Sequence, residues 1–395
     1  MRIAVIAPSI YMSEKTYPQR IFAPRVVTLQ LVDGLVKKGH EVTLFSAPDI
    51  ETKAKLVPGA ESLLKGDLLR DKYLKREILE EYRLQSAIES QNLYSLDLIG
   101  RAFKETQKSS FDIIQTDDPL VHAFVSLIKT PVVFTFHDPP PSEKSLDCWF
   151  LNRYKKHNFI SISLAQQKGS LSLNFVGNVY HGIKINELDV SYKEGQYFAY
   201  MGRLLVQKGA DIAIQVIKSL NEKLFIATDK THFNTIFVKE KILPYVDGRK
   251  IKIMGFLSSL SEKVDFLKKA KAFLFPIQWE EPFGLVMIES MACGTPVVAF
   301  ARGSVPEVIK DGETGFIVNS SKEDKRGDWI VKKTGTEGFY EAVKKIYAMP
   351  KEEYLQMRQN CRKHAQENFT IEKMVDNYEK VYQKILASQG VALRS

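Results

Sequence analysis

Residues 275–318 read FPIQWEEPFGLVMIESMACGTPVVAFARGSVPEVIKDGETGFIV, and no other stretch of the chain says as much about its fold. The apolar run 272–275 is typical of a covered parallel strand, which Pro276 ends before polar residues begin. Apolar residues at helical spacing then predict a helix from Phe283, and Gly294-Thr295-Pro296 predicts a turn into a second strand at 297–300. Ligands of open α/β sheets bind past the carboxyl ends of the strands, so functional groups are expected between this strand and helix.

The start of this helix is suited to an anionic ligand. Free backbone N–H groups at Gly284, Leu285 and Val286 form its positive end, and Gly284 lets an anion approach without a Cβ in the way. Glu281 lies in the loop and Glu289 about one and a half turns into the helix, so both carboxylates can reach one ligand. We expect Glu281 to hold sugar hydroxyls and Glu289 ribose hydroxyls on either side of a diphosphate. The alternative is a helix with two solvated glutamates.

A pair of cations precedes another expected helix. Gly202-Arg203 follows the apolar run 197–200, and Lys208 comes just before a helical pattern from about Ala210 to Leu220. Arg203 and Lys208 can neutralise a diphosphate and stabilise the charge that develops as it leaves. The alternative interpretation is a turn that carries surface cations.

His137 marks the end of a further strand and stands beside Asp138. A histidine there can hydrogen-bond a sugar or stabilise a transition state, and a structural role is the alternative. We interpret His40, His122 and His181 as structural.

Short apolar runs alternate with helical patterns along the chain, which predicts an α/β fold with two doubly wound parallel sheets. The expected strands are 2–7, 42–46, 112–115, 131–136, 159–163 and 178–182 in the first half, and 197–200, 224–227, 251–254, 272–275 and 297–300 in the second. Residues 50–108 lack alternation and predict several helices. Polarity rises over 183–196, so a linker is expected there between domains 1–190 and 191–370. Thr370 can cap a final helix.

Length and composition agree with two globular domains, because 395 residues can bury two cores. The apolar runs are too short to span a membrane and the first strand begins at once, so we expect a cytoplasmic protein without a signal peptide. The three cysteines lack metal-site spacing and are expected to be reduced and buried. The net charge of +9 comes without a nucleic-acid-binding signature, while a weak peripheral contact with an anionic membrane surface stays open.

The motif EPFGLVMIE, with Glu281 and Glu289 at its ends, resembles the E-x7-E signature of retaining glycosyltransferases of the GT-B fold, specifically the group 1 (family 4) transferases. The resemblance continues through MACGTPVVAF, GSVPEVI and DGETGFIV, and reappears at GRLLVQKGAD, MRIAVIAP and LVKKGHEVTLFSA. It spans most of the chain and is strongest over 197–318.

This resemblance implies two Rossmann-like domains that face a central cleft: an acceptor-side domain 1–190, a nucleotide-sugar-binding domain 191–370, and a last helix in 371–395 that crosses back onto the first. It implies transfer of a hexosyl unit from a UDP- or GDP-sugar to a hydroxyl acceptor, which is a sugar, a lipid-linked molecule or a small molecule, with retention of configuration. The implied catalytic residues are Glu281, His137, Arg203 and Lys208. The implied donor-binding residues are Gly202, Arg203, Lys208, Gly255, Phe256, Glu281, Phe283, Gly284, Leu285, Val286 and Glu289, with the base contacted near Gly255 and Phe256.

No D-x-D motif follows a strand, and Thr116-Asp117-Asp118 lacks that spacing, so we expect no obligate metal or other cofactor. Members of the family usually carry a Gly-Gly pair after the first strand, where this chain has YPQRIFAPRVV. Proline fixes φ and lacks an N–H, so Ala23-Pro24 cannot replace the pair, although Arg20 or Arg25 can compensate by charge. A second departure is the polar insertion SSKEDKRGDWIVKKTG at 320–335, which predicts a surface loop.

Three other functions share part of this logic. A nucleotide-sugar epimerase or a sugar phosphorylase would have the same fold, although a phosphorylase needs a lysine for pyridoxal phosphate that we cannot place. A non-catalytic sugar-nucleotide-binding protein would keep Arg203 and Lys208 but tolerate loss of Glu281. An NAD oxidoreductase is disfavoured because neither Ala7-Pro8-Ser9 nor Gly202-Arg203 belongs to a G-x-G-x-x-G motif.

Overall fold

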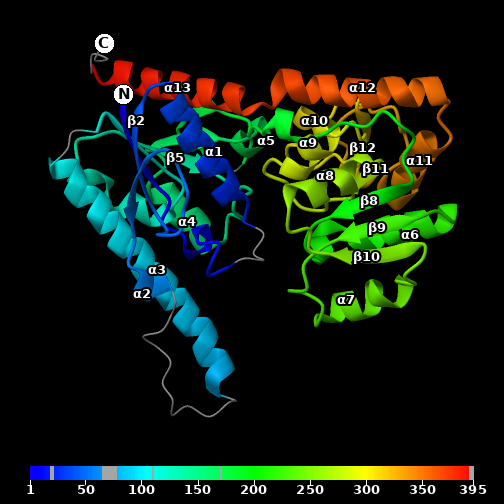
Figure 1. Ribbon diagram of the computed structural model, residues 1–395, viewed down its shortest axis with the longest axis horizontal. Helices are drawn as coiled ribbons and strands as arrows, with labels where there is room; N and C mark the ends of the chain where they lie inside the picture. The colour runs from blue at the N-terminus through cyan, green and yellow to red at the C-terminus, as the bar shows by residue number, and fades with distance from the viewer. Residues whose placement is uncertain (18–21, 65–77, 109–110, 170, 391–395) are drawn as a thin grey trace.

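The computed structural model describes residues 1–17, 22–64, 78–108, 111–169 and 171–390, and it contains two parallel β-sheets flanked by helices (Figure 1). The first sheet has seven strands in the order β3-β2-β1-β4-β5-β6-β7. Its strands are β1 (Arg2–Ile6), β2 (Glu41–Ser46), β3 (Lys55–Pro58), β4 (Ile113–Thr116), β5 (Val132–Phe136), β6 (Asn158–Ser161) and β7 (Phe175–Asn178). Because β1 lies between β2 and β4, the chain winds outward from it in both directions.

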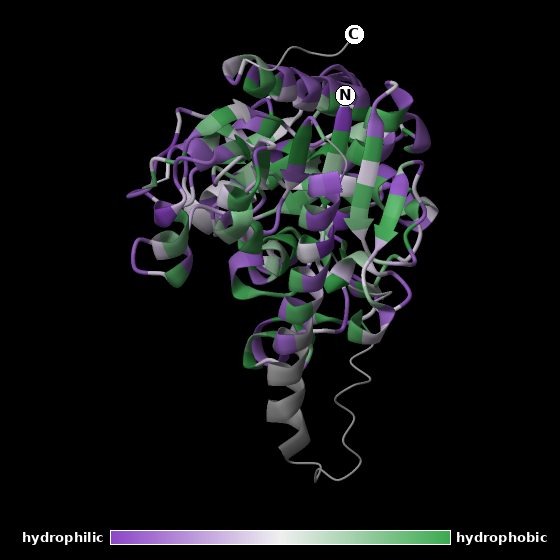
Figure 2. Ribbon diagram, turned by 90° about the vertical axis from the view of Figure 1, so that its left-hand side faces the viewer, coloured by the Kyte–Doolittle hydropathy of each residue, from purple (hydrophilic) through white to green (hydrophobic). Residues whose placement is uncertain are grey.

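The second sheet has six strands in the order β10-β9-β8-β11-β12-β13. Its strands are β8 (Tyr197–Met201), β9 (Leu224–Ala227), β10 (Ile251–Gly255), β11 (Ala270–Phe275), β12 (Val297–Phe300) and β13 (Gly315–Val318). Figure 2 shows hydrophobic residues concentrated in strands and hydrophilic residues on the outer helices and loops. Helices cover both faces of a parallel sheet, so its strands read as nearly continuous apolar runs. The expected α/β fold with two doubly wound sheets is confirmed.

Helices follow the strands throughout. Those of the first half are η1 (Ile10–Met12), α1 (Ala23–Lys37), α2 (Glu61–Leu64), α3 (Ile78–Lys108), η3 (Pro119–Leu127), α4 (Leu146–Arg153) and α5 (Leu164–Gln167). Those of the second half are η4 (Ile185–Glu187), η5 (Val206–Lys208), α6 (Ala210–Leu220), α7 (Ile236–Lys241), η6 (Leu243–Tyr245), α8 (Leu260–Lys268), α9 (Leu285–Ala292), α10 (Val305–Val308), α11 (Gly335–Tyr347) and α12 (Lys351–Asn368). The last helix is α13 (Ile371–Ser388).

Helix α13 returns to the first sheet, and Figure 1 shows α12 and α13 running end to end past both halves. The Thr370 hydroxyl caps α13 by accepting the Lys373 N–H. Six apolar or aromatic residues of α13 join the core of the first half: Met374, Val375, Tyr378, Val381, Tyr382 and Ile385. Burying such side chains contributes about 1.5–3 kcal/mol each. The Tyr378 hydroxyl also lies 2.9 Å from the Thr135 hydroxyl of β5, which fixes the helix on this sheet.

Several expected elements differ from the structure. Strand β3 was not expected, because it is a short edge strand whose ends, Lys55 and Pro58, are exposed and atypical of a core strand. The last strand of the first sheet is β7 at Phe175–Asn178, so the strand expected at 178–182 is wrong. The helix expected from Leu120 is a 3₁₀ helix, η3. The domain limits at 190 and 370 stay predictions.

The three cysteines are free and buried, as expected. Within the described part of the chain, no helix is both long and apolar enough to cross a membrane.

Candidate functional site

A cavity of about 1790 Å³ lies between the two halves of the molecule. Its walls come from α1 and the ends of the strands of the first sheet on one side, and from the ends of β8, β10 and β11 with helices α8 and α9 on the other. All but one of the predicted site residues line it: His137, Gly202, Arg203, Lys208, Phe256, Glu281, Phe283, Gly284, Leu285, Val286 and Glu289. Gly255 is the exception and ends β10 just before Phe256, so the structure brings the set together as the sequence predicts.

The start of α9 opens into this cavity. Gly284 is its N-cap residue and adopts the left-handed conformation with φ of +77°, which disfavours every other residue type. A Cβ at Gly284 would lie 2.7 Å from the Met287 side chain, so a larger residue would also have to displace its neighbours. No side chain caps this helix end. The first N–H groups of α9 therefore face the cavity without intrahelical partners and can donate to an anion.

Glu281 and Lys208 form an ion pair beside the α9 start. Their Oε2 and Nζ atoms lie 2.8 Å apart, and only 11% and 15% of the two side chains are exposed. The Trp279 indole N–H donates to the same carboxylate oxygen at 2.8 Å, and Lys208 Nζ lies 4.3 Å from the centre of the Trp279 ring. Partial burial strengthens this pair relative to one in water. The carboxylate is thus held in one place while it can still accept bonds from a ligand.

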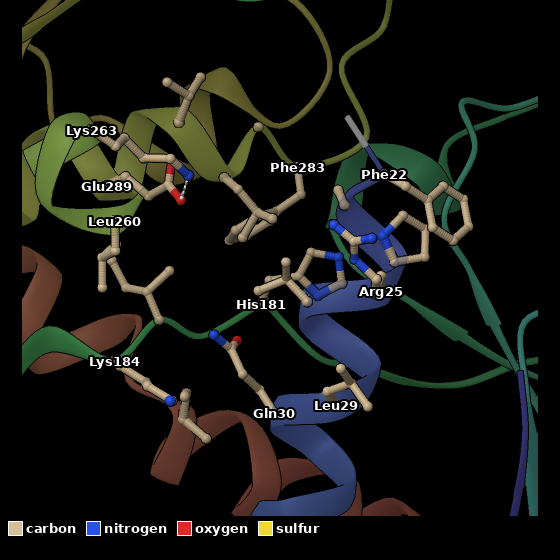
Figure 3. A pocket seen from close by; sticks show the side chains of 18 of the residues that line it. Phe22, Arg25, Leu29, Gln30, His181, Lys184, Leu260, Lys263, Phe283 and Glu289 are labelled. Atoms are coloured by element: carbon tan, nitrogen blue, oxygen red, sulfur yellow. Dashed lines mark hydrogen bonds and ion pairs between the residues drawn. The ribbon is translucent and has the colours of Figure 1, made fainter. Parts of the chain in front are cut away.

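Glu289 has a partner that the sequence reasoning missed. Lys263 of α8 donates to its carboxylate at 2.8 Å, and Figure 3 shows this pair facing the cavity. The charge of Glu289 raises the pKa of Lys263. Lys263 carried no signal in the sequence, because it sits among the charged residues of a helix whose register against α9 depends on tertiary packing. A carboxylate shared with one lysine keeps further acceptor positions for ribose hydroxyls.

The side chain of Tyr200 fixes the loop that carries Arg203 and Lys208. The buried Tyr200 hydroxyl lies 3.4 Å from the Arg203 carbonyl oxygen and 3.3 Å from that of Lys208, and it donates to this pair of oxygens. Within the described residues, no hydrogen bond or ion pair engages the Arg203 guanidinium. Arg203 therefore has its full donor set for a ligand in the cavity.

His137 lines the opposite wall, where its Nε2 atom lies 3.7 Å from the carboxylate of Asp117. Burial lowers the pKa of His137 to about 4. Burial, followed by the charge of Asp118, raises the pKa of Asp117 to about 7. The His137 side chain keeps 15% of its surface exposed, so it is accessible as a neutral imidazole near pH 7. It can exchange hydrogen bonds with a sugar hydroxyl, but it does not bring a positive charge.

The segment after β1 carries Ala23 and Pro24 where the family resemblance implies a Gly-Gly pair. Ala23 and Pro24 form the first turn of α1. Arg25 follows and lines the cavity; Figure 3 shows it beside His181. Its Nη2 atom is 3.5 Å from Glu14, and its buried Nη1 atom has no hydrogen-bond partner. Arg20, the other residue expected to compensate by charge, lies outside the described residues.

Within the ranges that the structure describes, no group of three or more histidine, cysteine, aspartate or glutamate residues is arranged to hold a metal ion.

Comparisons with known protein families give two matches. A model described as Glycosyltransferase Family 4 matches residues 25–167, and one described as Glycosyl transferases group 1 matches residues 186–332. The first matched range covers β2 to β6, and the second covers β8 to β13; together they contain most of the residues that line the cavity.

Curated relatives are distant. An uncharacterized glycosyltransferase, MJ1607, of Methanocaldococcus jannaschii is 24% identical over 78% of this chain and 84% of that protein. N-acetyl-alpha-D-glucosaminyl L-malate synthase of Bacillus anthracis is 29% identical over 46% of this chain. This chain matches 42% of the length of that synthase. It matches 39% of the length of another uncharacterized glycosyltransferase of M. jannaschii, MJ1178.

Solved structures share the fold over nearly the whole chain. Sucrose-phosphate synthase from Thermosynechococcus elongatus superimposes with a TM-score of 0.73 at 17% identity, covering 98% of this chain and 100% of that one. HepE of Anabaena, solved in complex with UDP-glucose, gives a TM-score of 0.64 at 18% identity with 98% and 100% coverage. At these identities the likeness establishes the shared architecture of two facing sheets.

Proposed function

The chain belongs to the group 1, family 4 glycosyltransferases, and on that premise we propose that it transfers a hexosyl unit from a UDP- or GDP-sugar to a hydroxyl acceptor with retention of configuration. One observation carries the proposal: the Lys208–Glu281 pair stands at 2.8 Å beside the uncapped start of α9, inside one cavity between the sheets. A cation, a carboxylate and free amides together match the chemistry of a sugar joined to a diphosphate.

In the proposed complex the diphosphate binds at the α9 start. The amides of Leu285 and Val286 donate to it, and Arg203 and Lys208 balance its charge. Glu281 accepts from hydroxyls of the sugar, and Glu289, held by Lys263, accepts from those of the ribose. The base lies against backbone groups near Phe256, at the end of β10. Support comes from HepE, which was solved with UDP and with UDP-glucose.

The proposed chemistry is a substitution on one face of the sugar. The bond between the anomeric carbon and the phosphate oxygen breaks, the acceptor oxygen bonds to that carbon on the same face, and its proton passes to the leaving phosphate. Arg203, Lys208 and the α9 amides stabilise the charge that develops on the diphosphate. His137, neutral near pH 7, exchanges a hydrogen bond with a sugar hydroxyl. We further propose that these groups make a divalent metal unnecessary.

Product analysis with purified protein tests the function. A thermal-shift screen of nucleotide sugars identifies the donor, because a ligand at 100 times its Kd adds about 2.7 kcal/mol of stability. NMR of the product then reports the anomeric configuration. We expect free UDP or GDP and a glycoside with the donor's configuration.

The same assay separates the alternatives. An epimerase would change the sugar without releasing nucleotide, and a phosphorylase would need inorganic phosphate and form a sugar phosphate. A binding protein would give a thermal shift without turnover. Any of these outcomes would contradict the proposal.

A further inference from the structure

Two arginines, Arg302 and Arg326, bind the side chain of Glu280, the residue that precedes Glu281. The Glu280 carboxylate receives two parallel bonds from Arg326, at 2.6 Å from Nη1 and 2.7 Å from Nη2. It also accepts from Arg302 Nη1 at 3.1 Å and from the Gly303 N–H at 2.9 Å. Burial alone would raise the pKa of Glu280, but these bonds outweigh it and keep the pKa below its usual value. A bidentate arginine pair sets orientation as well as distance, so the carboxylate is fixed in direction.

Arg326 belongs to the polar insertion at 320–335, and that segment is itself anchored. The Asn319 Oδ1 atom accepts the Arg326 N–H at 2.8 Å and the Trp329 indole N–H at 3.1 Å. Asp324 accepts from Arg326 Nε at 2.8 Å. Val331 is 1% exposed. The segment contains no helix or strand before Gly335, in agreement with the expected loop, but its side chains tie it to the body of the domain.

The backbone of Glu281 is held on its other side by the turn after β12. The Ser304 N–H donates to the Glu281 carbonyl at 2.9 Å, and the Ser304 hydroxyl donates to the Phe283 carbonyl at 2.8 Å. Gly303 has φ of +55°, and a Cβ there would lie 2.2 Å from the Glu281 carbonyl oxygen, so only glycine fits. The loop is therefore fixed by both side-chain and backbone contacts.

We propose that the segment 319–334 is a brace for the loop that carries Glu281, and that Arg326 is its positioning residue. This inference rests on the proposed function. Glu280 points toward the brace while the next side chain, Glu281, reaches Lys208 in the cavity. Because the two residues are consecutive, holding the Glu280 side chain on the brace also holds the Glu281 side chain in its direction toward the cavity. Small misplacements of a positioning group reduce turnover strongly, so the brace acts on the rate more than on binding.

Kinetics of Arg326→Ala test this role. Its kcat should fall by about tenfold or more, because the Glu281 carboxylate loses its fixed position. The Kd for UDP or GDP should stay within about twofold, because the diphosphate contacts the α9 amides, Arg203 and Lys208 and not the brace. Arg326→Lys keeps the charge but not the two parallel bonds, and it should recover part of the lost rate. Lys322→Ala and Lys325→Ala, which remove exposed cations of the same segment, are the matched controls and should behave as the wild type.

A double variant separates positioning from general stabilisation. In a Glu281→Ala background, Arg326→Ala should cause no further loss of rate, because the group that it positions is absent. A further loss as large as that in the wild-type background would overturn the proposal, as would an unchanged kcat in a folded Arg326→Ala protein.

A spectroscopic readout keeps the brace testable without turnover. The Trp279 indole donates to Glu281, so its ¹⁹F resonance in protein labelled with 5-fluorotryptophan reports the position of that carboxylate. Trp279→Phe assigns the signal. Arg326→Ala should shift it and Lys325→Ala should not; an unmoved signal would refute the brace. If the wild type turns over no nucleotide sugar while the signal shifts, the proposed function fails and the brace stands.

Discussion

The ammonium group of Lys208 lies 2.8 Å from the carboxylate of Glu281. A diphosphate at the start of α9 would compete for this ammonium, and a sugar would compete for the carboxylate. In the proposed complex, donor binding would therefore replace one internal ion pair by contacts from both of its members. The structure thus holds two groups of opposite charge in position, each neutralising the other.

Loss of the Glu281 carboxylate should stop transfer. We expect Glu281→Gln to reduce kcat by at least about 100-fold, in the range found for removing one preorganised stabilising group. The protein should stay folded, because glutamine keeps the volume of the side chain. Glu313→Gln, at an exposed carboxylate of the same domain, is the control. Near-normal turnover by Glu281→Gln would reject the role of Glu281.

The two cations of the β8–α6 loop should carry nucleotide affinity. Charge-assisted hydrogen bonds are worth roughly 1.5–3 kcal/mol each, so Arg203→Ala with Lys208→Ala should weaken UDP or GDP binding by several kcal/mol at most. Isothermal titration calorimetry measures this, with Lys230→Ala as a control at an exposed cation of the same half. Unchanged affinity in the double variant would contradict the phosphate assignment.

The carboxylate of Glu307 connects the two halves of the molecule. Glu307 of α10 accepts the Leu164 and Ala165 N–H groups at 2.7 and 2.6 Å and the Tyr180 hydroxyl at 2.8 Å. Glu307→Ala leaves these donors to water, and we expect it to lower the free energy of unfolding by about 1.5–3 kcal/mol. Chemical denaturation measures the loss, with Glu313→Ala as control. A loss no larger than that of the control would show that the contact contributes nothing.

The raised pKa of Asp117 should appear in the stability of the protein. Its pKa is about 7 in the folded protein against 3.8 for an ordinary aspartate, so the folded state keeps a proton that the unfolded chain releases. The resulting stability is complete below about pH 4 and is lost as the pH rises through 7. The pKa of His137 is lowered to about 4, so its contribution to stability has the opposite pH dependence. This contribution cancels when the wild type is compared with a variant that also contains His137.

Asp117→Asn isolates this contribution. The free energy of unfolding of the wild type minus that of Asp117→Asn should decrease as the pH rises from 4 to 7, in urea titrations at fixed salt. A difference that stays constant with pH would show that Asp117 titrates normally.

Metal dependence has a simple assay. If Arg203, Lys208 and the α9 amides balance the diphosphate, turnover should persist after dialysis against excess EDTA. A complete loss that Mg²⁺ restores would overturn the metal-free proposal.

Local patterns were sufficient to predict two parallel sheets, most of their strands and the α9 start. Gly284 after a buried strand and before an apolar helix predicts an anion site at a helix end, and the structure places this residue at the cavity. Strand β3 was missed because an edge strand ending in Lys55 and Pro58 has no core pattern. The position of such a strand is set by its pairing with the neighbouring strand, here β2, and not by a pattern in its own sequence.

The partners of the site residues could not be predicted from the sequence. Lys263, Glu280 and Arg326 look like solvated charges on a helix or loop, and only the tertiary fold brings them to Glu289 or to the Glu281 loop. Arg326 is 46 residues from Glu280 along the chain, so no spacing rule connects them. The same holds for Glu307, whose three donors come from the other half of the molecule.

A crystal structure of the protein with UDP or GDP tests the central claim most directly. We predict density for the diphosphate at the start of α9, within hydrogen-bond distance of the Leu285 or Val286 amide and of the Lys208 ammonium, with Glu281 beside it. Diphosphate density elsewhere in the cavity, away from α9 and Lys208, would contradict the account.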